Sequence, residues 1–492
     1  MSAATLLSVD PRFERFLQQE MTKGLLRFTT AGSVDDGKST LIGRLLYDSQ
    51  SVFDDQIESV AKASAGRNAG PIDFSLLTDG LRAEREQGIT IDVAYRYFAT
   101  PRRKFIIADT PGHEQYTRNM VTGASTADLA VILVDARKGL LPQSRRHASV
   151  AALLGIKHLV VAVNKMDMVG YREPVFTEIE ASFRKFLSRF GDTEAYFIPV
   201  SALAGDNVVV PSGRMRWYKG PTLLSYLETV EVESRGQHSP FRFPVQRVVR
   251  PDQEFRGYAG TVASGKIRVG MPVTIMPSGR SSIVETISTF DGNLEEAAAG
   301  QAVTLTLADE IDIIRGDVIV SSDDLPHVGS SIRATVVWLH QDAGQENKRY
   351  RLKHTTRQEW SSIVRIQHAV NINTQQHEPA QSLEMNAIGV VDIETARPLC
   401  FDPYQENRVT GSFILVDPAT NATIAAGMIS GPNSSVPQQP TAEGNLSWRV
   451  EGNSLVISLP RDHSISGVGR TSDPETLESL QRLLKRLESN DV

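Results

Sequence analysis

One stretch near the N-terminus limits the possible folds more than any other part of the chain. Residues 32–40 read G-S-V-D-D-G-K-S-T and fit the phosphate-binding loop pattern G-x-x-x-x-G-K-S/T. Residues 25–30 are apolar and β-branched enough to form a strand, and residues 41–46 have helical spacing. The stretch therefore lies between a strand and a helix, which is the context that such a loop requires.

The residue types in this loop suit phosphate binding. Gly32 and Gly37 lack a Cβ atom, so the backbone can fold closely around phosphate oxygens. Main-chain N–H groups then point inward, and the start of the following helix adds partial positive charge. We expect Lys38 to reach the β- and γ-phosphates and Ser39 to ligate Mg²⁺. The predicted nucleotide-binding residues are Gly32, Ser33, Val34, Asp35, Asp36, Gly37, Lys38, Ser39 and Thr40.

A second motif follows the predicted strand 104–108, at the end of the strand where ligands bind in open α/β sheets. Asp109 is expected to hold Mg²⁺ through a water, and Gly112 to turn its N–H onto the γ-phosphate. His113 is the candidate catalytic residue, because it could orient the attacking water. A histidine after a turn is more often a plain surface residue, and only its place beside Asp-x-x-Gly favours catalysis. The predicted contacts here are Asp109, Thr110, Pro111, Gly112 and His113.

The polar stretch 48–88 is too long for a simple connection and predicts a functional, mobile region. It ends in G-I-T-I-D at residues 88–92. A lone threonine in a strand usually reflects β-propensity. Because Thr90 lies between the two phosphate motifs, we expect it to sense the γ-phosphate and to ligate Mg²⁺.

A third motif reads the base. It consists of Asn164, Lys165, Met166 and Asp167, directly after the predicted strand 159–163. The Asp167 carboxylate can accept from the ring imino N–H and the exocyclic amine of guanine, a donor pair that adenine lacks. Asn164 would brace the loop, and the stem of Lys165 would cover the base. The last base-contacting loop is predicted at Ser201, Ala202 and Leu203, whose main-chain N–H groups would face the guanine oxygen.

The three motifs in this order predict a GTPase that uses GTP and Mg²⁺. From residue 25 to about 232, predicted strands and helices alternate, which indicates a mostly parallel sheet with flanking helices. GTP hydrolysis requires little covalent chemistry from the protein. The protein must position a water and neutralise developing charge. Arg145, Arg146 and His147 form a basic cluster that we interpret as a solvated helix face.

Composition sets the broad class. The chain has 492 residues, 40% apolar and 22% charged, which is typical of a soluble protein of several domains. Its net charge of −6 gives no case for nonspecific nucleic-acid binding. The single cysteine, Cys400, excludes an intramolecular disulfide and is expected to be a small core residue, which fits the cytoplasm. We find no membrane-spanning segment and no signal peptide in the sequence.

The pattern changes near residue 241 to short alternating segments separated by turns, which predicts β-barrels. We find no Lys/Arg-rich stripe in this region. The last part contains a predicted strand at 455–459 and an amphipathic helix at about 473–487. The expected organisation is an N-terminal helix at 1–24, a GTP-binding domain at 25–235, barrels at 240–325 and 331–432, and a linker with an extension of unassigned role at 433–492.

An α/β P-loop GTPase domain followed by two β-barrels resembles the translational GTPase family, which includes elongation factor Tu. The chain is more closely similar to the large, GTPase subunit of bacterial ATP sulfurylase (sulfate adenylyltransferase). The resemblance is carried by residues 32–48, 86–98, 105–126 and 255–264, covers about 25–428 and weakens after 325. Asp36 stands where elongation factors usually place histidine, and residues 114–118 read E-Q-Y-T-R rather than the elongation-factor sequence. Both departures are expected for the sulfurylase subunit.

The resemblance implies a partner, the small catalytic subunit, in a heterodimer or a higher assembly of heterodimers. That partner would form adenosine 5′-phosphosulfate and pyrophosphate from ATP and sulfate, an uphill reaction. GTP hydrolysis in this chain would be coupled to it through Thr90 and residues 109–113. Only one phosphate-loop match is present, so we expect this chain to lack the fused kinase domain of some relatives. Asp35 occupies a position where some relatives bind a monovalent cation, but simple loop structure is the favoured explanation.

Two other functions remain open. An elongation-factor-like GTPase delivering aminoacyl-tRNA would share the fold and the motifs. Asp36, residues 114–115 and the missing basic stripe in the barrels argue against it. A free-standing GTPase switch with an unrelated partner is the third reading. For the sulfurylase subunit we expect no membrane and no nucleic-acid partner.

Overall fold

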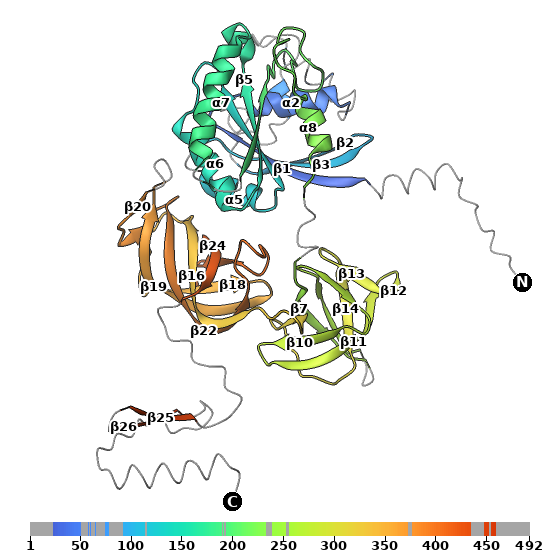
Figure 1. Cartoon of the computed structure of the whole chain (residues 1–492), viewed down its shortest axis with the longest axis vertical. Helices are drawn as coiled ribbons and strands as arrows, with labels where there is room; N and C mark the ends of the chain where they lie inside the picture. The colour runs from blue at the N-terminus through green and yellow to red at the C-terminus, as the bar shows by residue number, and fades with distance from the viewer. Residues whose placement is uncertain are drawn as a thin grey trace, which may run out of the picture. The chain divides into compact units, whose positions relative to one another are not determined.

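The computed structural model describes residues 23–50, 58, 60, 64, 74–77, 92–113, 116–188, 190, 193–232, 239–251, 255–371, 376–433, 447–451 and 454–458. The chain separates into two compact units, residues 1–433 and 434–492. Figure 1 shows the α/β domain and the two β-barrels of the first unit, coloured along the chain. The predicted N-terminal helix 1–24 and the predicted helix 473–487 lie outside the described residues, apart from residues 23 and 24.

The α/β domain is built on one six-stranded sheet in the order β2-β3-β1-β4-β5-β6. All neighbouring strands are parallel except β2 and β3, which are antiparallel. The strands are β1 (Gly24–Gly32), β2 (Ala94–Ala99), β3 (Arg103–Asp109), β4 (Leu129–Asp135), β5 (His158–Asn164) and β6 (Glu194–Pro199). The predicted mostly parallel sheet is confirmed, and β2 is a strand that the sequence reading missed.

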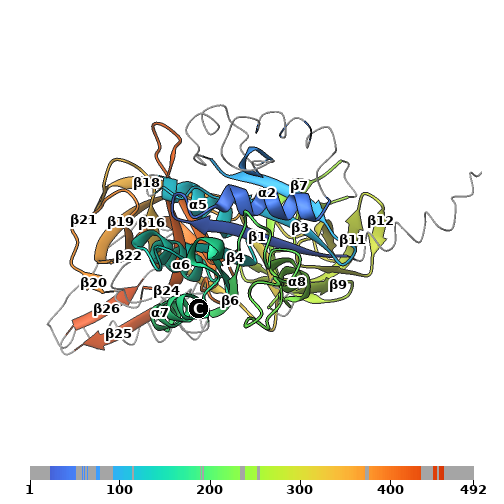
Figure 2. The ribbon, with the colours of Figure 1, turned by 90° about the horizontal axis from the view of Figure 1, so that it is seen from above.

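Helices cover both faces of this sheet, and β4 shows why. Its alternate residues face opposite sides, as the pleat requires. Leu129, Val131 and Leu133 pack in the cluster that contains α2 (Lys38–Asp48) and α8 (Leu223–Thr229). Its other apolar residues pack in the cluster that contains α5 (Thr117–Ser125), α6 (Pro142–Leu153) and α7 (Glu173–Leu187). Figure 2 shows α2 and α6 on opposite sides of the sheet. Every residue of β4 is buried, which explains its continuous apolar sequence.

The first barrel begins after residue 240. Strands β10, β15, β7, β8, β14 and β11 pair in a ring that the β10–β11 pairing closes. The strands of this domain are β7 (Arg242–Val249), β8 (Gly257–Thr261), β9 (Lys266–Arg268), β10 (Pro272–Met276), β11 (Arg280–Thr289), β12 (Gly292–Leu294), β13 (Glu296–Ala298), β14 (Ala302–Leu307) and β15 (Val318–Ser321). The sequence predicted one segment at 260–268, whereas the structure separates β8 from β9.

The second barrel closes in the same way, through the β18–β19 pairing, with β18, β23, β24, β16, β22 and β19 around the ring. Its strands are β16 (His327–Trp338), β17 (Gly344–Gln345), β18 (Arg349–His354), β19 (Arg357–Val370), β20 (His377–Glu378), β21 (Ser382–Leu383), β22 (Ile388–Phe401), β23 (Ser412–Val416) and β24 (Thr423–Pro432). Cys400 on β22 is buried, as expected of a small core residue. The two predicted barrels are thus confirmed.

The second unit is described only at one antiparallel hairpin, β25 (Ser447–Glu451) and β26 (Ser454–Ser458). The strand predicted at 455–459 corresponds to β26. Among the residues that the structure describes, no helix has the length and apolar character needed to cross a membrane.

Candidate nucleotide site

The phosphate-binding loop connects β1 to α2. Gly37 precedes the helix with φ +90°, and a Cβ atom there would lie 2.6 Å from Nδ2 of Asn164. Glycine is therefore required both by the backbone conformation and by the neighbouring side chain. Lys38 is buried, and its Nζ donates to the carbonyl oxygens of Gly32 (3.2 Å) and Ser33 (3.4 Å). Burial lowers the pKa of Lys38, and the nearby carboxylates of Asp109, Asp36 and Asp35 oppose that shift.

Asp36 lies inside the loop, not at its surface. Its side chain is 1% exposed, and Oδ2 accepts from the backbone N–H of Ser33 at 2.7 Å. Oδ1 has no hydrogen-bond partner in the described part of the chain. Burial raises the pKa of Asp36 to about 6, against the lowering effects of the Ser33 hydrogen bond and of Lys38. Asp35, by contrast, is exposed and has φ +67°. The two adjacent carboxylates therefore have different roles, and Asp36 fixes the shape of the loop.

The second motif lies directly against this loop. Thr30 of β1 is in register with Asp109 of β3, and its hydroxyl donates to Asp109 Oδ1 at 3.0 Å. A Cβ atom on Gly112 would lie 2.6 Å from the Gly32 carbonyl oxygen and 2.6 Å from Lys38 Nζ. The Gly112 backbone thus touches the loop that would hold phosphate.

His113 follows this close contact and is half-buried. Its ring packs edge-on against Tyr116, with 6.3 Å between centroids, and its carbonyl accepts from the Tyr116 N–H at 3.0 Å. Thr110 is buried and donates its hydroxyl to the Thr30 carbonyl at 2.6 Å, and Pro111 is also buried. The structure therefore places the candidate catalytic histidine at the edge of the predicted phosphate site. Thr90, the third predicted Mg²⁺ ligand, lies outside the described residues.

The base-reading loops meet the phosphate-binding loop at Asn164. Its Nδ2 donates to the Asp36 carbonyl at 2.7 Å, and its Oδ1 accepts from the Ala202 N–H at 2.9 Å. Asp167 Oδ1 accepts from the Ser201 hydroxyl at 2.6 Å. A single buried amide therefore joins three segments that lie far apart in the sequence.

Two N–H groups of the last base loop are used within the protein. Ser201 N donates to the Asp206 carbonyl, and Ala202 N donates to Asn164. The N–H of Leu203 has no hydrogen-bond partner among the described residues, and its side chain is 54% exposed. Met166 is buried beneath the loop. Of the three N–H groups predicted to face the guanine oxygen, Leu203 is the one left available.

One acidic and one basic side chain that the sequence reading missed, Asp135 and Arg137, lie beside the site. Asp135, at the end of β4, is buried and binds Arg137 (2.6 Å) and Nζ of Lys165 (3.0 Å). Burial by itself would raise the pKa of Asp135, but the hydrogen bonds from Arg137 and Lys165 lower it well below its usual range. Lys165 Nζ also donates to the Asp35 carbonyl. The signal in the sequence was its place at the end of a buried strand, on the same edge as Asp109 and Asn164.

Helix α6 brings further polar groups to the loop. The hydroxyls of Ser144 and Ser33 lie 3.4 Å apart, and His147 is 4% exposed. Burial lowers the pKa of His147 to about 3, and the charges of Lys38 and Arg146 add to the effect. The interpretation of residues 145–147 as a solvated face is therefore wrong for His147, which points into the core as a neutral ring. Arg145 and Arg146 are half-buried.

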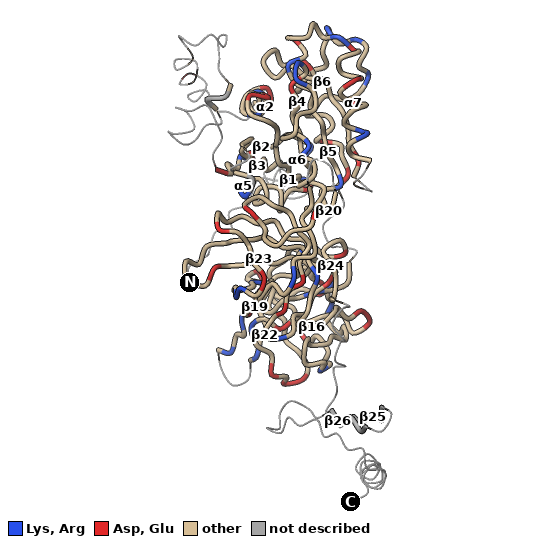
Figure 3. The backbone as a smooth tube through the Cα atoms, turned by 90° about the vertical axis from the view of Figure 1, so that its left-hand side faces the viewer, with Lys and Arg blue, Asp and Glu red and all other residues tan. Residues whose placement is uncertain are grey.

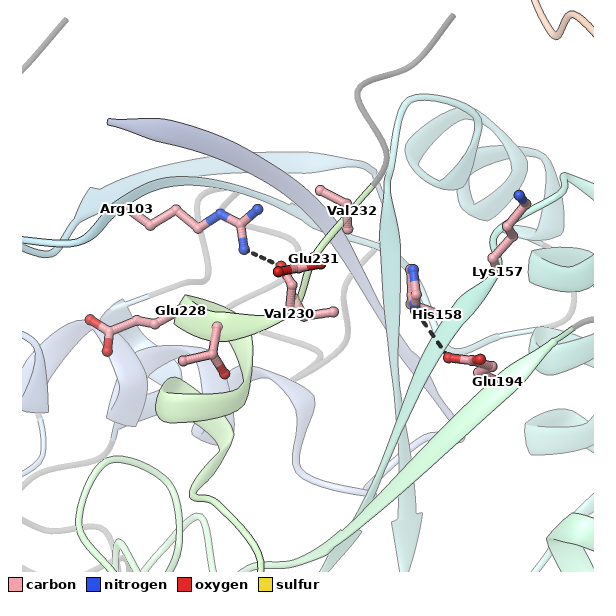
Figure 4. A pocket seen from close by; sticks show the side chains of 9 residues that line it. Arg103, Lys157, His158, Glu194, Glu228, Val230, Glu231 and Val232 are labelled. Carbon is pink, nitrogen blue, oxygen red and sulfur yellow. Dashed lines mark hydrogen bonds and ion pairs between the residues drawn. The ribbon is translucent and has the colours of Figure 1, made fainter. Parts of the chain in front are cut away.

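A pocket lies at the other end of the sheet from these loops. It has a volume of about 850 Å³ and is lined by Arg103, Lys157, His158, Glu194 and residues 228–232. Arg103, His158 and Glu194 begin β3, β5 and β6, so this pocket is at the amino ends of the strands. Figure 4 shows Arg103 directed at the main chain near Val230, and its Nη1 donates to the Val230 carbonyl at 2.7 Å. The predicted nucleotide loops lie at the opposite, carboxyl ends of the strands.

Each of the three domains matches a known family model. Residues 23–236 match the family model "Elongation factor Tu GTP binding domain", 258–320 match "Elongation factor Tu domain 2", and 331–430 match "GTP-eEF1A C-terminal domain-like". The boundaries expected from the sequence were 25–235, 240–325 and 331–432.

Relatives that align with most of this chain identify its family more specifically than the domain matches do. "Sulfate adenylyltransferase subunit 1" of Francisella tularensis subsp. novicida (strain U112) is 49% identical over 90% of this chain and 94% of the relative. The protein of the same name from Aeromonas hydrophila subsp. hydrophila is 53% identical over 85% and 88%. "Bifunctional enzyme NodQ" of Rhizobium sp. (strain BR816) is 54% identical over 83% of this chain, which spans 65% of that longer protein. The chain belongs to the family of sulfate adenylyltransferase subunit 1 and carries the GTP-binding domain of the elongation factor Tu type.

Proposed function

We propose that this chain is the GTP-hydrolysing subunit of sulfate adenylyltransferase. It couples GTP hydrolysis to the formation of adenosine 5′-phosphosulfate and pyrophosphate from ATP and sulfate. One observation carries the proposal: the Asn164 amide joins the phosphate loop to both base loops in a chain about half identical to proteins of that name. A partner carries the ATP and sulfate chemistry, and we propose that it is the small catalytic subunit, in the cytoplasm.

The residues of the site divide the work of hydrolysis. Asp167 and the Leu203 N–H select guanine, and the loop 32–40 holds the phosphates with Lys38 as the fixed positive charge. His113 orients the attacking water at the edge of the phosphate site. Gly112 responds to the presence of the γ-phosphate, because it lies so close to the Gly32 carbonyl and Lys38 that a Cβ atom would clash with both.

The donor chemistry of the site fits Mg²⁺. Ser39 offers a hydroxyl in the first turn of α2, and Asp109 offers a carboxylate at the end of β3, which are the hard oxygen ligands that Mg²⁺ prefers. We propose that Ser39, Thr90 and Asp109 hold the ion. Once bound, it would neutralise charge on the β- and γ-phosphate oxygens.

The decisive experiment is a coupled assay on the chain purified with its partner. ATP and sulfate are supplied, and pyrophosphate release is compared with and without GTP. We expect GTP to stimulate sulfate-dependent release in the wild type. The His113→Ala variant should bind GTP normally and lose both hydrolysis and stimulation. GTP hydrolysis that ignores ATP and sulfate, together with copurified tRNA, would favour the elongation-factor reading instead.

A further inference from the structure

A compact basic patch lies on the outer face of the second barrel. The segment 348–365 contains six basic residues and one acidic residue. The sequence reading that the barrels lack a Lys/Arg-rich stripe is therefore wrong. On β18 the side chains of Leu352, Tyr350 and His354 point into the core, so the intervening residues point outward. We define the basic patch as Arg349, Arg351, Lys353 and Trp360. Figure 3, where Lys and Arg positions are blue along the backbone, shows blue segments near the β19 label.

The positive charges of the patch are not neutralised within the described part of the chain. None of Arg349, Arg351 and Lys353 forms an ion pair with a described residue. The one acidic residue of the segment, Glu359, is paired with Arg357 at 3.0 Å, and both side chains are largely buried. Glu394, exposed on β22, and Asp417, next to Lys348, bound the patch on its two sides. Three cations on one strand that have no ion pair with a described residue repel each other, and a binding partner can relieve this repulsion.

Trp360 gives the patch a fixed geometry. It is the cross-strand neighbour of Arg351 and is 40% exposed. The guanidinium carbons of Arg349 and Arg351 lie over its ring, 5.1 and 5.3 Å from the centroid. The cation–π contact restrains each guanidinium, and a guanidinium over an aromatic ring can still donate its N–H groups to a carboxylate. Less rotamer freedom is then lost on binding, and Arg with Trp is the composition of protein interface hot spots.

We propose that the basic patch is a docking surface for a protein partner that presents a cluster of carboxylates. Resting on the proposed function, this partner is the small catalytic subunit. A protein fits better than nucleic acid for two reasons. The net charge of the chain is −6, and the ring of Trp360, the one exposed aromatic of the patch, already contacts the guanidinium groups of Arg349 and Arg351, which a stacked base would have to displace. Carboxylates instead bind guanidinium N–H groups directly and need no aromatic face.

The test compares two charge reversals of equal size in the full chain. The patch variant is Arg349→Glu/Arg351→Glu/Lys353→Glu. The matched control is Arg247→Glu/Arg250→Glu/Arg280→Glu, three exposed basic residues of the first barrel. Binding to the purified small subunit is measured at about 0.05 M and about 0.5 M salt. We expect the patch variant to bind about 100-fold more weakly at low salt and to lose the salt dependence, and the control to change less than about threefold. Trp360→Ala should weaken binding about tenfold, because the guanidiniums lose their platform.

Intrinsic GTP hydrolysis of both triple variants should equal that of the wild type, which shows that the nucleotide site is folded. A patch variant that binds the small subunit as tightly as the wild type would overturn the docking surface while leaving the proposed function intact. Equal weakening by the control would also overturn it. If the wild type itself neither binds the small subunit nor stimulates pyrophosphate release, the result contradicts the proposed function, and with it the docking surface that rests on it. Loss of tRNA binding instead, with subunit binding unchanged, would assign the patch to nucleic acid.

Discussion

The phenolic hydroxyl of Tyr404 donates a buried hydrogen bond of 3.1 Å to the backbone carbonyl of Leu154, 250 residues away in the sequence. Leu154 directly follows α6, and the other end of that helix brings Ser144 to within 3.4 Å of Ser33 in the phosphate-binding loop. Around Tyr404, Val337, Ile388 and Met428 of the second barrel join the apolar cluster of α5, α6 and α7. Helix α6 thus connects the nucleotide site to the second barrel.

Removing the hydroxyl should loosen this connection without disturbing either domain. In Tyr404→Phe one buried hydrogen bond is lost and the Leu154 carbonyl is left unsatisfied, which costs about 1–3 kcal/mol. We expect faster hydrogen exchange around residues 154–156 and weaker GTP stimulation of the partner. Tyr258→Phe is the matched control, since it removes a hydrogen bond of 2.8 Å to Ile311 within the first barrel. Equal losses of stimulation in both variants would contradict a role for α6 in coupling.

Asn164→Ala should separate the phosphate loop from the base loops. The variant loses two buried hydrogen bonds, to the Asp36 carbonyl and from the Ala202 N–H. A loss of about 2–3 kcal/mol corresponds to roughly 30- to 150-fold weaker GTP and GDP binding. Fluorescent nucleotide titration measures it. Asn407→Ala, which also removes buried amide hydrogen bonds but lies between the barrels, should leave nucleotide affinity unchanged.

Gly112→Ala should block the contact between the two phosphate motifs. The new Cβ would lie 2.6 Å from the Gly32 carbonyl, a distance that requires the loop to move away. We expect GDP binding to be retained and GTP hydrolysis to fall by about 100-fold, because Gly112 no longer reaches the γ-phosphate. Single-turnover hydrolysis tests this. Gly213→Ala has an open space around its Cβ and should behave as the wild type; if Gly112→Ala does so too, the contact has no role in hydrolysis.

Arg242 holds the two barrels together. It is 2% exposed and binds Asp402 of the second barrel (2.9 Å) and Asp324 of the connection between barrels (2.8 Å). Arg242→Met leaves the buried Asp402 carboxylate without its cation, which should cost about 3–5 kcal/mol. Arg256→Met breaks an exposed pair with Asp312 and should cost less than about 1 kcal/mol. Thermal unfolding of the two variants would show the difference, and similar midpoints would refute it.

Asp36 should make the nucleotide-free protein less stable as the pH rises. Burial raises the pKa of Asp36 from 3.8 to about 6, so between these values the folded state keeps a proton that the unfolded chain has lost. Stability therefore falls with increasing pH across this window. Asp36→Asn keeps an oxygen for the Ser33 N–H and removes the titration. We expect the variant to show a smaller decrease in melting temperature between about pH 4.5 and about pH 7 than the wild type; identical pH profiles would contradict the assignment.

The sequence by itself determined the α/β domain, its three nucleotide motifs and the two barrels that follow. Each of these depends on local patterns: glycine positions in a loop, period-two alternation in strands, and polar residues directly after buried strands. The same local patterns wrongly predicted that His147 lies on a solvated helix face, because helical spacing does not show which neighbouring segment buries a polar residue. It also overlooked the basic patch, whose residues alternate with core residues on β18.

Only the tertiary structure decided which distant groups meet. Asn164 reaches Asp36 across 128 residues, Arg242 reaches Asp402 across 160, and Tyr404 reaches Leu154 across 250. The sequence around each of these residues does not predict its hydrogen-bond partner. The pairing follows from how a parallel sheet brings its strand ends to one edge and how the domains bury their polar groups only where a hydrogen bond is available.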